Sequence, residues 1–243
     1  MKQQLKIAII GYGKMGKTVE QTALARKHHI ILIIDNEDDW TTKGEKLKDC
    51  DAAIEFTTPE TAADNIRKCF EAGVPVVSGT TGWYHDLPNI EKLCLKQKNT
   101  LFFASNFSIG VNIFFALNEK LAGMLSYLEG YHPRIIETHH TEKLDAPSGT
   151  AITLAKQIID ARKSLDKWGD ASEILPSNVL PVKSYRIENI TGTHVVHYNS
   201  VIDSIEIKHT SHTRTGFAEG AILAAEWVQN KEGIFTMQDM LNL

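Results

Sequence analysis

The chain has 243 residues, 42% of them hydrophobic and 23% charged, which suffices for one large domain or two modest ones with buried cores. A formal net charge of −4 argues against a general nucleic-acid-binding protein, which would carry a basic surface. The apolar runs are too short to cross a bilayer, no signal-peptide cleavage site is present, and the cysteines have no metal-like spacing, so we expect a cytoplasmic protein without a membrane partner.

The amino-terminal segment has the order of a mononucleotide-binding unit. An apolar strand over 5–10 is followed by the glycine turn GYGKMG, an amphipathic helix over 17–27, and a second apolar strand over 30–34. Gly11 and Gly13 can adopt turn conformations closed to other residues and let a pyrophosphate approach the backbone. Gly16 permits close packing of helix on strand, and Asp35, just after the second strand, can accept hydrogen bonds from ribose hydroxyls.

Alternating strands and helices continue to about residue 106. Strands are predicted over 51–56 and 74–79, and helices over 59–73 and 86–98. This alternation favours a parallel sheet covered on both faces, in which ligands bind beyond the carboxyl ends of the strands. Three of these ends carry the polar turns FTTPE, SGTTGW and ASNFS, which together offer a nicotinamide its hydrogen-bond donors and acceptors.

The pattern changes after Asn106. A long helix is predicted over 108–128, a strand over 131–140 and a helix over 148–161, before a succession of strand-like stretches from 185 to 212. Consecutive strands indicate a mostly antiparallel sheet. The tail is helical again and is expected to return to the first domain. We therefore expect an α/β protein whose Rossmann-type parallel-sheet domain comprises 1–106 and 215–243, with an α+β, mostly antiparallel domain over 107–214.

The segment ETHHTEKLDAPSGTA, residues 137–151, gathers groups that packing alone does not require. Neighbouring side chains on a strand point to opposite faces, so we expect His139 and His140 to have different roles. Lys143 lies in the following loop, where its ammonium can bind an anion or donate a proton. The Ser-Gly-Thr triplet at 148–150 begins a helix, whose first amides favour a carboxylate or phosphate. The segment predicts a pocket for a small, highly anionic substrate.

Residues 137–151 resemble the signature of the dihydrodipicolinate reductase family, whose pattern E-x-H-H-x-x-K-x-D-A-P-S-G-T-A they match. GTTG at 79–82, ASNFSIGVN at 104–112 and FAEGAILAAEWV at 217–228 are also similar to that family, so the resemblance covers nearly the whole chain. It implies hydride transfer from NADH or NADPH to a cyclic conjugated imine with two carboxylates, in lysine and diaminopimelate biosynthesis. It also implies a homotetramer assembled through the second domain, which would bind substrate as well.

The resemblance assigns roles to individual residues. His139 is implied as the acid/base residue and Lys143 as the proton donor, and the substrate would be held by His140, Lys143, Ser148, Gly149 and Thr150. Hydride addition leaves negative charge on the substrate, which a nearby cationic acid can neutralise. Contacts to the nicotinamide nucleotide are implied for Gly11, Tyr12, Gly13, Lys14, Met15, Gly16, Asp35, Phe56, Thr57, Gly79, Thr80, Thr81, Ala104, Ser105, Asn106 and Phe107.

The choice between NADH and NADPH depends on the end of the second strand. Asp35 is followed by Asn36, where family members that tolerate NADPH often carry an arginine. A carboxylate attracts ribose hydroxyls and repels a 2′-phosphate, although Lys14 in the glycine turn can offset part of that repulsion. We therefore expect NADH to be preferred over NADPH.

Two other classes of protein fit parts of the sequence. A zinc hydrolase would use some of its histidines, but no three share a recognised ligand spacing, so no metal is expected; the histidines concerned are His139, His140, His194, His197, His209 and His212. A non-catalytic NAD-sensing or scaffold protein would keep the dinucleotide fold without needing His139 and Lys143 together. Metal analysis tests the first alternative, and separate replacement of His139 and Lys143 by alanine tests the second.

Overall fold

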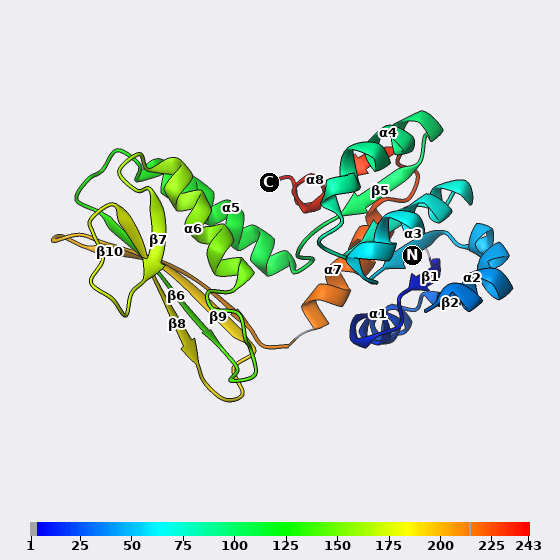
Figure 1. Cartoon of the computed structure of the whole chain (residues 1–243), viewed down its shortest axis with the longest axis horizontal. Coiled ribbons are helices and arrows are strands. Elements are labelled where there is room, and N and C mark those ends of the chain that lie inside the picture. Colours follow the sequence, from blue (N-terminus) through cyan, green and yellow to red (C-terminus); the bar gives the residue numbers. More distant parts are fainter. Residues whose placement is uncertain (1–3, 214) are drawn as a thin grey trace. The chain divides into compact units, whose positions relative to one another are not determined.

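The computed structural model describes residues 4–213 and 215–243, so the expected domain boundary at residue 214 lies outside the described residues. The chain divides into two compact units, one formed by Met1–Ile109 with Thr215–Leu243 and the other by Gly110–Arg214. Each unit has its own sheet and its own hydrophobic core (Figure 1).

Within the described residues, the first unit contains a six-stranded sheet with the order β11-β5-β4-β3-β1-β2. All of its strand pairs are parallel. Short apolar runs form these strands because a strand covered on both faces needs hydrophobic side chains on both. The strands are β1 (Lys6–Ile10), β2 (His29–Ile34), β3 (Ala52–Glu55), β4 (Val76–Ser78), β5 (Thr100–Phe103) and β11 (Gly233–Phe235).

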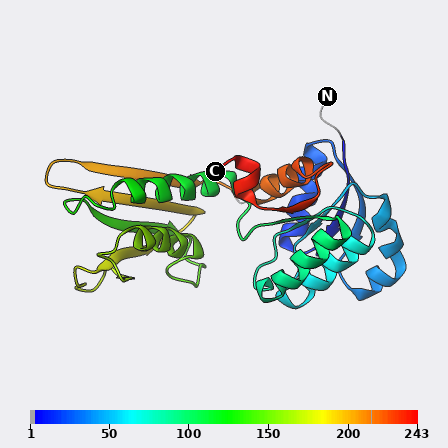
Figure 2. The same cartoon turned by 90° about the horizontal axis from the view of Figure 1, so that it is seen from above.

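Helices cover both faces of this sheet (Figure 2). One face packs against α1, α7 and α8 through a core that includes Ile9, Ile54 and Phe102. The other face packs against α2, α3 and α4 through Ile10 and Val76. The helices are α1 (Lys14–Ala25), α2 (Glu37–Lys43), α3 (Pro59–Glu71), α4 (Leu87–Gln97), α7 (Thr215–Trp227) and α8 (Met237–Leu241), with 3-10 helices η1 (Gly44–Asp49) and η2 (Tyr84–Asp86).

The carboxyl-terminal segment joins the first unit with a strand as well as with helices. β11 pairs with β5, Ile234 lying opposite Leu101 in the register, and extends the sheet at its edge. The sequence did not predict this strand, because its three residues are too few to show a period. Helix α2 was also not predicted, since its sequence EDDWTTK carries Trp40 as the one large apolar side chain.

The second unit has, among the described residues, a five-stranded sheet with the order β10-β9-β6-β8-β7. Two helices lie along one face of it (Figure 1), and the core between them includes Phe114, Ile135, Leu154 and Tyr198. The elements are α5 (Ile109–Met124), β6 (His132–His139), α6 (Gly149–Ala161), β7 (Lys167–Asp170), β8 (Val179–Arg186), β9 (Gly192–Asn199) and β10 (Ser204–Ser211).

This second sheet is mixed, whereas the sequence predicts a mostly antiparallel one. The pairs β6–β9 and β9–β10 are antiparallel, but β6–β8 and β7–β8 are parallel. Helix α6 follows β6 and carries the chain back along the sheet, and such a crossover lets the next strands run parallel to β6. The α/β fold class, with a Rossmann-type parallel sheet and a second α+β unit, is confirmed.

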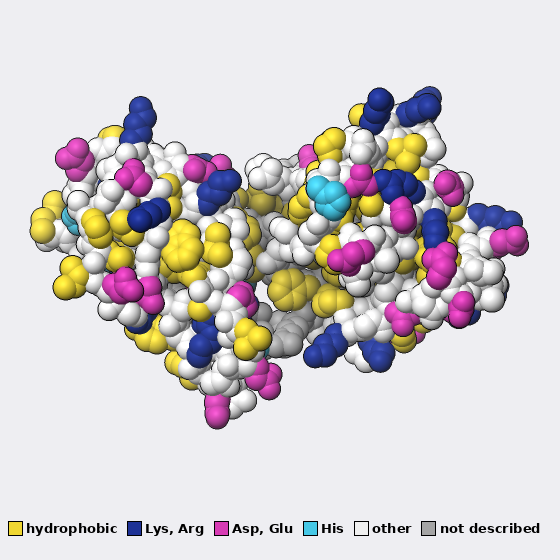
Figure 3. Space-filling view, viewed as in Figure 1, with side chains coloured by type: hydrophobic (Ala, Val, Ile, Leu, Met, Phe, Trp, Pro, Cys, Tyr) yellow, Lys and Arg dark blue, Asp and Glu magenta, His cyan; other side chains and the backbone are white. Residues whose placement is uncertain are grey.

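The surface of the second unit carries apolar side chains. In the space-filling view they lie among charged ones over α5 and α6 (Figure 3). Exposed members on these helices are Ile113, Leu117, Met124 and Ile152. None of the helices in the described part of the chain combines the length and apolarity needed to span a membrane.

Candidate functional site

The turn GYGKMG after β1 brings the backbone close to neighbouring segments. Gly11 has φ +89°, and a Cβ there would lie 2.1 Å from the carbonyl oxygen of Phe56. A Cβ at Gly16 would lie 2.2 Å from the carbonyl oxygen of Gly11, so glycine is needed where α1 meets the turn. Gly13, the N-cap of α1, has open space around its Cβ position and makes no side-chain cap. The amides of this first turn are thus available to a phosphate.

A cavity of about 480 Å³ lies at the carboxyl ends of β1, β2 and β3. Gly11, Gly13, Asp35, Phe56 and Thr57 are among the residues that line it. In the sheet, β1 has β2 on one side and β3 on the other. This is the topological switch point, where doubly wound sheets bind nucleotides.

The residues around this cavity fit a dinucleotide. Asp35 Oδ1 accepts a hydrogen bond from the Tyr12 N–H at 2.6 Å, so the carboxylate stands beside the glycine turn that would hold the pyrophosphate. The indole of Trp40 forms part of the wall and donates from Nε1 to Asn65 Oδ1 at 3.0 Å. Lys68 lies over that indole, 4.6 Å from the ring centroid. The cavity therefore offers amides for phosphates, a carboxylate for ribose hydroxyls and an aromatic wall for a base.

The other predicted cofactor residues around the turn differ in what they can offer. The Tyr12 hydroxyl donates to Glu20, and the Tyr12 and Met15 side chains pack against the core. Lys14 is exposed at the start of α1. Tyr12 and Met15 can therefore present their backbone to a ligand, while Lys14 can also present its ammonium.

Predicted cofactor residues after β4 and β5 lie at the same edge of the sheet. Thr80 is buried and its hydroxyl donates to Glu55 at 2.7 Å, whereas Thr81 is exposed. A Cβ at Gly79 would lie 2.0 Å from the Phe56 ring, so that turn also requires glycine. Ala104 and Ser105 follow β5 directly.

Asn106 and Phe107 end that second loop. Asn106 Oδ1 accepts a hydrogen bond from the Ser108 N–H at 2.8 Å. The Phe107 ring is buried and packs against Phe56 and Phe102. Phe107 can therefore contact a ligand through its backbone, while its side chain belongs to the core.

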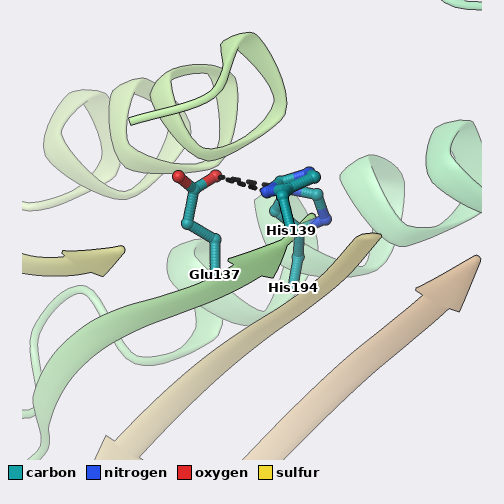
Figure 4. Close-up of side chains that lie close together, drawn as sticks. All are labelled: Glu137, His139 and His194. Carbon is teal, nitrogen blue, oxygen red and sulfur yellow. Dashed lines mark ion pairs between the residues drawn. The ribbon is translucent and has the colours of Figure 1, made fainter. Parts of the chain in front are cut away.

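A second cluster surrounds Glu137 on the sheet of the second unit (Figure 4). Glu137 is fully buried, and the strand register places His194 of β9 on one side of it and Ser184 of β8 on the other. Its carboxylate accepts hydrogen bonds from the Ser184 hydroxyl at 2.9 Å and from the Ser148 N–H at 3.1 Å. Burial raises the pKa of Glu137, but hydrogen bonds from His194, Ser148 and Ser184 outweigh it and hold the pKa below its usual range.

His139 ends β6 and lies on the same face of the sheet as Glu137, two residues earlier. Its Nδ1 is 3.6 Å from Glu137 Oε2, and its ring centroid is 4.9 Å from that of His194 (Figure 4). Burial lowers the pKa of His139 to about 4, helped by the charges of His194, Lys143 and Arg186 and opposed by Glu137. The imidazole is therefore neutral at pH 7.

His140 stands just beyond the end of β6. Its carbonyl oxygen accepts a hydrogen bond from the Lys143 N–H at 3.2 Å, which begins the turn carrying Lys143. His139 is buried and His140 is half-buried. The two adjacent imidazoles thus occupy different environments.

Arg186 ties the loop that carries Lys143 to the strand that carries Glu137. Its Nη2 lies 3.3 Å from Glu137 Oε1 and donates to the Asp145 carbonyl at 2.5 Å, and its Nε donates to the Lys143 carbonyl at 3.1 Å. The Lys143 ammonium donates to the Asp145 carboxylate at 2.7 and 2.9 Å. Because the Asp145 side chain is 58% exposed, water weakens this pair and a bound anion can compete for the ammonium.

Ser148 is the N-cap of α6, but its polar groups point into the unit. Its hydroxyl accepts from the Ala151 N–H at 3.2 Å and lies 3.1 Å from His194 Nε2, while its own N–H is bonded to Glu137. The sequence predicts that the first amides of this helix bind an anion, but the Ser148 amide is already bonded to Glu137 and cannot do so. Gly149 and Thr150 come next, and across the described residues their N–H groups have no acceptor. These two amides, unlike that of Ser148, are therefore available to an anion at the start of α6.

Glu137, His139 and His194 offer ligand atoms that lie within 4.8 Å of one another, which their spacing along the chain does not reveal. Glu137 Oε2 is 3.6 Å from both His139 Nδ1 and His194 Nε2. The Glu137 oxygens already accept hydrogen bonds, however, and the Arg186 guanidinium lies against one of them. A metal ion would face that guanidinium, so we interpret the trio as a cluster of buried polar side chains around one carboxylate and not as a metal site.

The sequence did not single out several members of these clusters, namely Trp40, Asn65, Lys68, Glu55, Ser184 and Arg186. Glu137 was quoted only as the first residue of the signature, and His194 was named only as a possible zinc ligand. A signal existed for Glu55 and Glu137, since a carboxylate inside an apolar strand has to be hydrogen-bonded or paired. Arg186 and His194 come from strands whose register brings them beside β6, and register is not readable from one strand's pattern.

Comparison with known proteins finds one family along both units. The family model described as dihydrodipicolinate reductase, N-terminus, matches residues 5–107, and that described as dihydrodipicolinate reductase, C-terminus, matches residues 110–241. A 4-hydroxy-tetrahydrodipicolinate reductase from Christiangramia forsetii is 47% identical over 242 residues, covering 98% of each chain. One from Neisseria gonorrhoeae is 36% identical over 203 residues, covering 81% of this chain and 74% of its own.

Solved structures share the fold. A dipicolinate-bound dihydrodipicolinate reductase from Paenisporosarcina sp. TG-14 has a TM-score of 0.75 at 23% identity, covering 98% of this chain and 99% of its own. A probable dehydrogenase from Thermotoga maritima has a TM-score of 0.56 at 13% identity, covering 97% and 92%. At these identities the likeness concerns the fold alone.

Proposed function

Because the chain belongs to the dihydrodipicolinate reductase family, we propose that it reduces 4-hydroxy-tetrahydrodipicolinate to tetrahydrodipicolinate, a step of lysine and diaminopimelate biosynthesis. Its cofactor is a nicotinamide dinucleotide. When bound, the reduced nicotinamide supplies the hydride. The chain's own residues then have to hold a cyclic dicarboxylate and supply a proton.

The observation that carries the proposal is the position of Arg186. One guanidinium contacts the Glu137 carboxylate, the Lys143 carbonyl and the Asp145 carbonyl, so the lysine loop is held beside the strand that ends at His139. The amides of α6 begin at Gly149 in the same unit. Lysine, arginine and a helix amino terminus together provide the positive potential that a dianionic substrate requires.

We assign proton donation to Lys143, with His139 as its acid/base partner. In the free protein, Lys143 Nζ lies 2.7 Å from the carboxylate of the exposed Asp145, from which a bound anion can draw it away. His139 is neutral near pH 7, so it cannot serve as a cationic acid before substrate binds. A bound dicarboxylate adds negative charge and would raise the pKa of His139, which prepares the imidazole to take or return a proton.

Substrate contacts follow from the same geometry. We propose that Gly149 and Thr150 bind one carboxylate through their backbone amides, and that His140 and Lys143 contact the rest of the anion. Ser148 supports this group from behind, because its N–H donates to Glu137 and its hydroxyl lies 3.1 Å from His194 Nε2. The contribution of Ser148 is to fix the start of α6 on the sheet.

We propose that NADH is preferred over NADPH. Asp35 lines the cavity together with two further acids, Glu37 and Asp64. The cation in the lining, Lys68, is already 3.2 Å from Glu37 and lies over Trp40. A 2′-phosphate placed near Asp35 would therefore meet mostly negative charge.

We also propose a cytoplasmic homotetramer assembled through the second unit. Support comes from two large apolar side chains that are exposed at the end of β8 and just after it, Tyr185 at 47% and Ile187 at 51%. Contiguous exposed apolar surface marks protein interfaces. Light scattering of the purified protein measures the assembly, and a monomeric mass would contradict this part of the proposal.

The activity is tested by following NADH consumption with substrate generated in place by dihydrodipicolinate synthase. We expect rapid oxidation of NADH by the wild-type chain, and a fall of about a hundredfold or more in turnover for Lys143→Ala and for His139→Ala. If both variants still bind NADH, the loss of turnover comes from the reaction step and not from cofactor binding. Unchanged turnover in both variants would contradict the assignment, and metal analysis of the protein tests the hydrolase alternative.

A further inference from the structure

Glu55, the last residue of β3, is a carboxylate with no exposed surface. Its Oε1 accepts hydrogen bonds from the Thr57 N–H at 2.9 Å, the Thr80 hydroxyl at 2.7 Å and the Thr57 hydroxyl. Its Oε2 accepts one from the Ser78 hydroxyl at 2.5 Å. These four donors are all uncharged, so hydrogen bonds alone replace the water that an ionised carboxylate loses on burial.

The sheet itself does not require a carboxylate at this position. Ile54 precedes Glu55, and Val77 lies in the neighbouring strand β4; both are fully buried and apolar. An apolar side chain at the end of β3 would avoid the cost of burying a charge. The contribution of Glu55 must therefore come from the groups it holds.

Those groups belong to two loops at the carboxyl edge of the sheet. Thr57 follows β3 and Thr80 follows β4, and the Thr57 N–H also donates to the Thr80 hydroxyl oxygen at 2.8 Å. The carboxylate thus fastens the two loops to each other. In a doubly wound sheet, this edge is where the nucleotide binds.

The network extends into the wall of the dinucleotide cavity. Asn65 is buried and donates from Nδ2 to the Thr57 hydroxyl at 3.2 Å, while its Oδ1 accepts from the Trp40 indole at 3.0 Å. Trp40, Thr57 and Asn65 all line the cavity. A continuous chain of hydrogen bonds therefore runs from the loop after β4, through Glu55, to the aromatic wall.

We propose that Glu55 is a positioning residue for dinucleotide binding. It holds Thr57 and Thr80 in place, and Thr57 in turn holds Asn65, which holds Trp40. The inference rests on the proposed dinucleotide-dependent function. Glutamine at this position would keep the shape of the side chain but turn an amide donor toward hydroxyl donors. The amide nitrogen would face either Ser78 or the donors of Thr57 and Thr80, so the donors on that side would lose their acceptor. The hydrogen bonds on the other side would lose the carboxylate charge that strengthens them.

The test is NADH binding to the purified full chain, measured by quenching of tryptophan fluorescence. We expect Glu55→Gln to weaken NADH binding by about tenfold or more, and Thr80→Val to do the same, because each removes a contact that sets the loop. The double variant should bind about as weakly as the weaker single variant, because both changes disrupt one contact.

The matched control is Asn99→Ala, which removes another buried polar side chain of the same unit. Asn99 donates to the Phe70 carbonyl at 3.2 Å and to Gln97 at 3.0 Å, and it does not line the cavity. We expect this variant to lower the thermal midpoint while NADH binding stays within about twofold of wild type.

Three results would overturn the proposal. In the first, Glu55→Gln lowers the thermal midpoint as the control does but binds NADH normally. In the second, the Glu55 and Thr80 effects on binding simply add. In the third, Glu55→Gln does not fold and Thr80→Val binds NADH as wild type does. A wild-type chain that binds NADH without reducing the substrate would contradict the proposed function instead, and these binding measurements would still decide the role of Glu55.

Discussion

Glu137 and His194 are cross-strand partners on β6 and β9, and Glu137 Oε2 lies 3.6 Å from His194 Nε2. Both side chains are buried, and Ser148, at the start of α6, contacts both of them. One carboxylate therefore joins two strands and a helix. Since His139 stands two residues further along β6, the same contacts also set the surroundings of the proposed acid/base residue.

Glu137→Gln should damage both stability and turnover. The change takes the charged acceptor from the partly exposed Arg186 and from the donors of Ser148 and Ser184, and losing hydrogen bonds to a buried charge costs roughly 1.5–3 kcal/mol. Thermal unfolding and steady-state turnover measure the two effects, and NADH binding in the other unit should persist. Glu142→Gln is the control, because Glu142 is exposed in the adjacent loop. Equal stability of the two variants would contradict the network described around Glu137.

Acid should unfold the protein partly through His139. Its pKa is about 4 in the folded chain and near 6.5 in an unfolded one, so below pH 6.5 the unfolded state binds more protons and stability falls until about pH 4. At about 1.4 kcal/mol per pKa unit, the loss amounts to roughly 3 kcal/mol. Glu137, whose pKa is lowered, adds a loss of the same sign at lower pH.

Urea unfolding at a series of pH values checks this expectation. Wild-type stability should decline between pH 6.5 and 4, and His139→Gln should flatten that part of the curve, because glutamine does not titrate. A His139→Gln curve with the wild-type slope would show that other groups bind the protons.

Sequence patterns predicted the helices and strands that have many periodic residues. They failed where pairing with another strand determines whether a strand forms or which direction it takes. The nucleotide unit could be read from its order, because a buried parallel strand and an amphipathic helix each leave a local pattern. β11 could not, since its three residues gain their strand conformation from β5. The parallel pairing of β6 with β8 likewise depends on the path of α6 and not on composition.

The candidate site likewise contains residues that the sequence could reveal and residues that it could not. His139 and Lys143 lie in one short segment and could be recognised together. Arg186 and His194 could not, because their contacts with Glu137 depend on the register of β8 and β9. A motif predicts that Ser148 begins a helix, but it does not predict where the hydroxyl points, because that depends on the contact with His194.

Gly192→Ala should impair turnover without affecting the dinucleotide cavity. A Cβ at Gly192 would stand 3.2 Å from both Cδ2 and Nε2 of His139, closer than ordinary van der Waals contact. The ring has little room to yield, since His194 and Glu137 lie against it. We expect turnover to fall about tenfold, because a displaced acid/base group transfers protons poorly.

Gly123→Ala is the control for this variant. Gly123 lies in α5, where a Cβ would meet open space, so alanine there should leave turnover unchanged and stabilise the helix by up to about 1 kcal/mol. If Gly192→Ala turned over substrate as fast as Gly123→Ala does, the close approach to His139 would be unimportant for the reaction.

Asp35→Asn should shift the cofactor preference toward NADPH. Asparagine keeps an oxygen that can accept the Tyr12 N–H, so the glycine turn should hold its shape while the negative charge is lost. We expect the ratio of kcat/KM for NADH to that for NADPH to fall by about tenfold. Asp38→Asn makes the same charge change at an exposed position that does not line the cavity, and should leave the ratio alone.

Glu226 should prove essential for attaching the carboxyl-terminal helix α7 to the rest of the first unit. Its carboxylate accepts hydrogen bonds from Arg26 at 2.7, 2.8 and 3.0 Å and lies 2.9 Å from His28 Nε2. His28 Nδ1 accepts from the Leu5 N–H, so the proton of this ring is on Nε2 and points at Glu226. One carboxylate thereby joins α7 to the end of α1 and, through His28, to the residue that precedes β1.

We therefore expect Glu226→Ala to destabilise the protein by roughly 2–4 kcal/mol, because it leaves the buried His28 donor without an acceptor and removes a bidentate arginine pair. Glu232→Ala, an exposed position just before β11, is the control and should change stability by less than about 0.5 kcal/mol. Urea unfolding measures both. Similar midpoints for the two variants would mean that the apolar packing of α7, through residues such as Ala221 and Ile222, attaches the helix without the polar contacts.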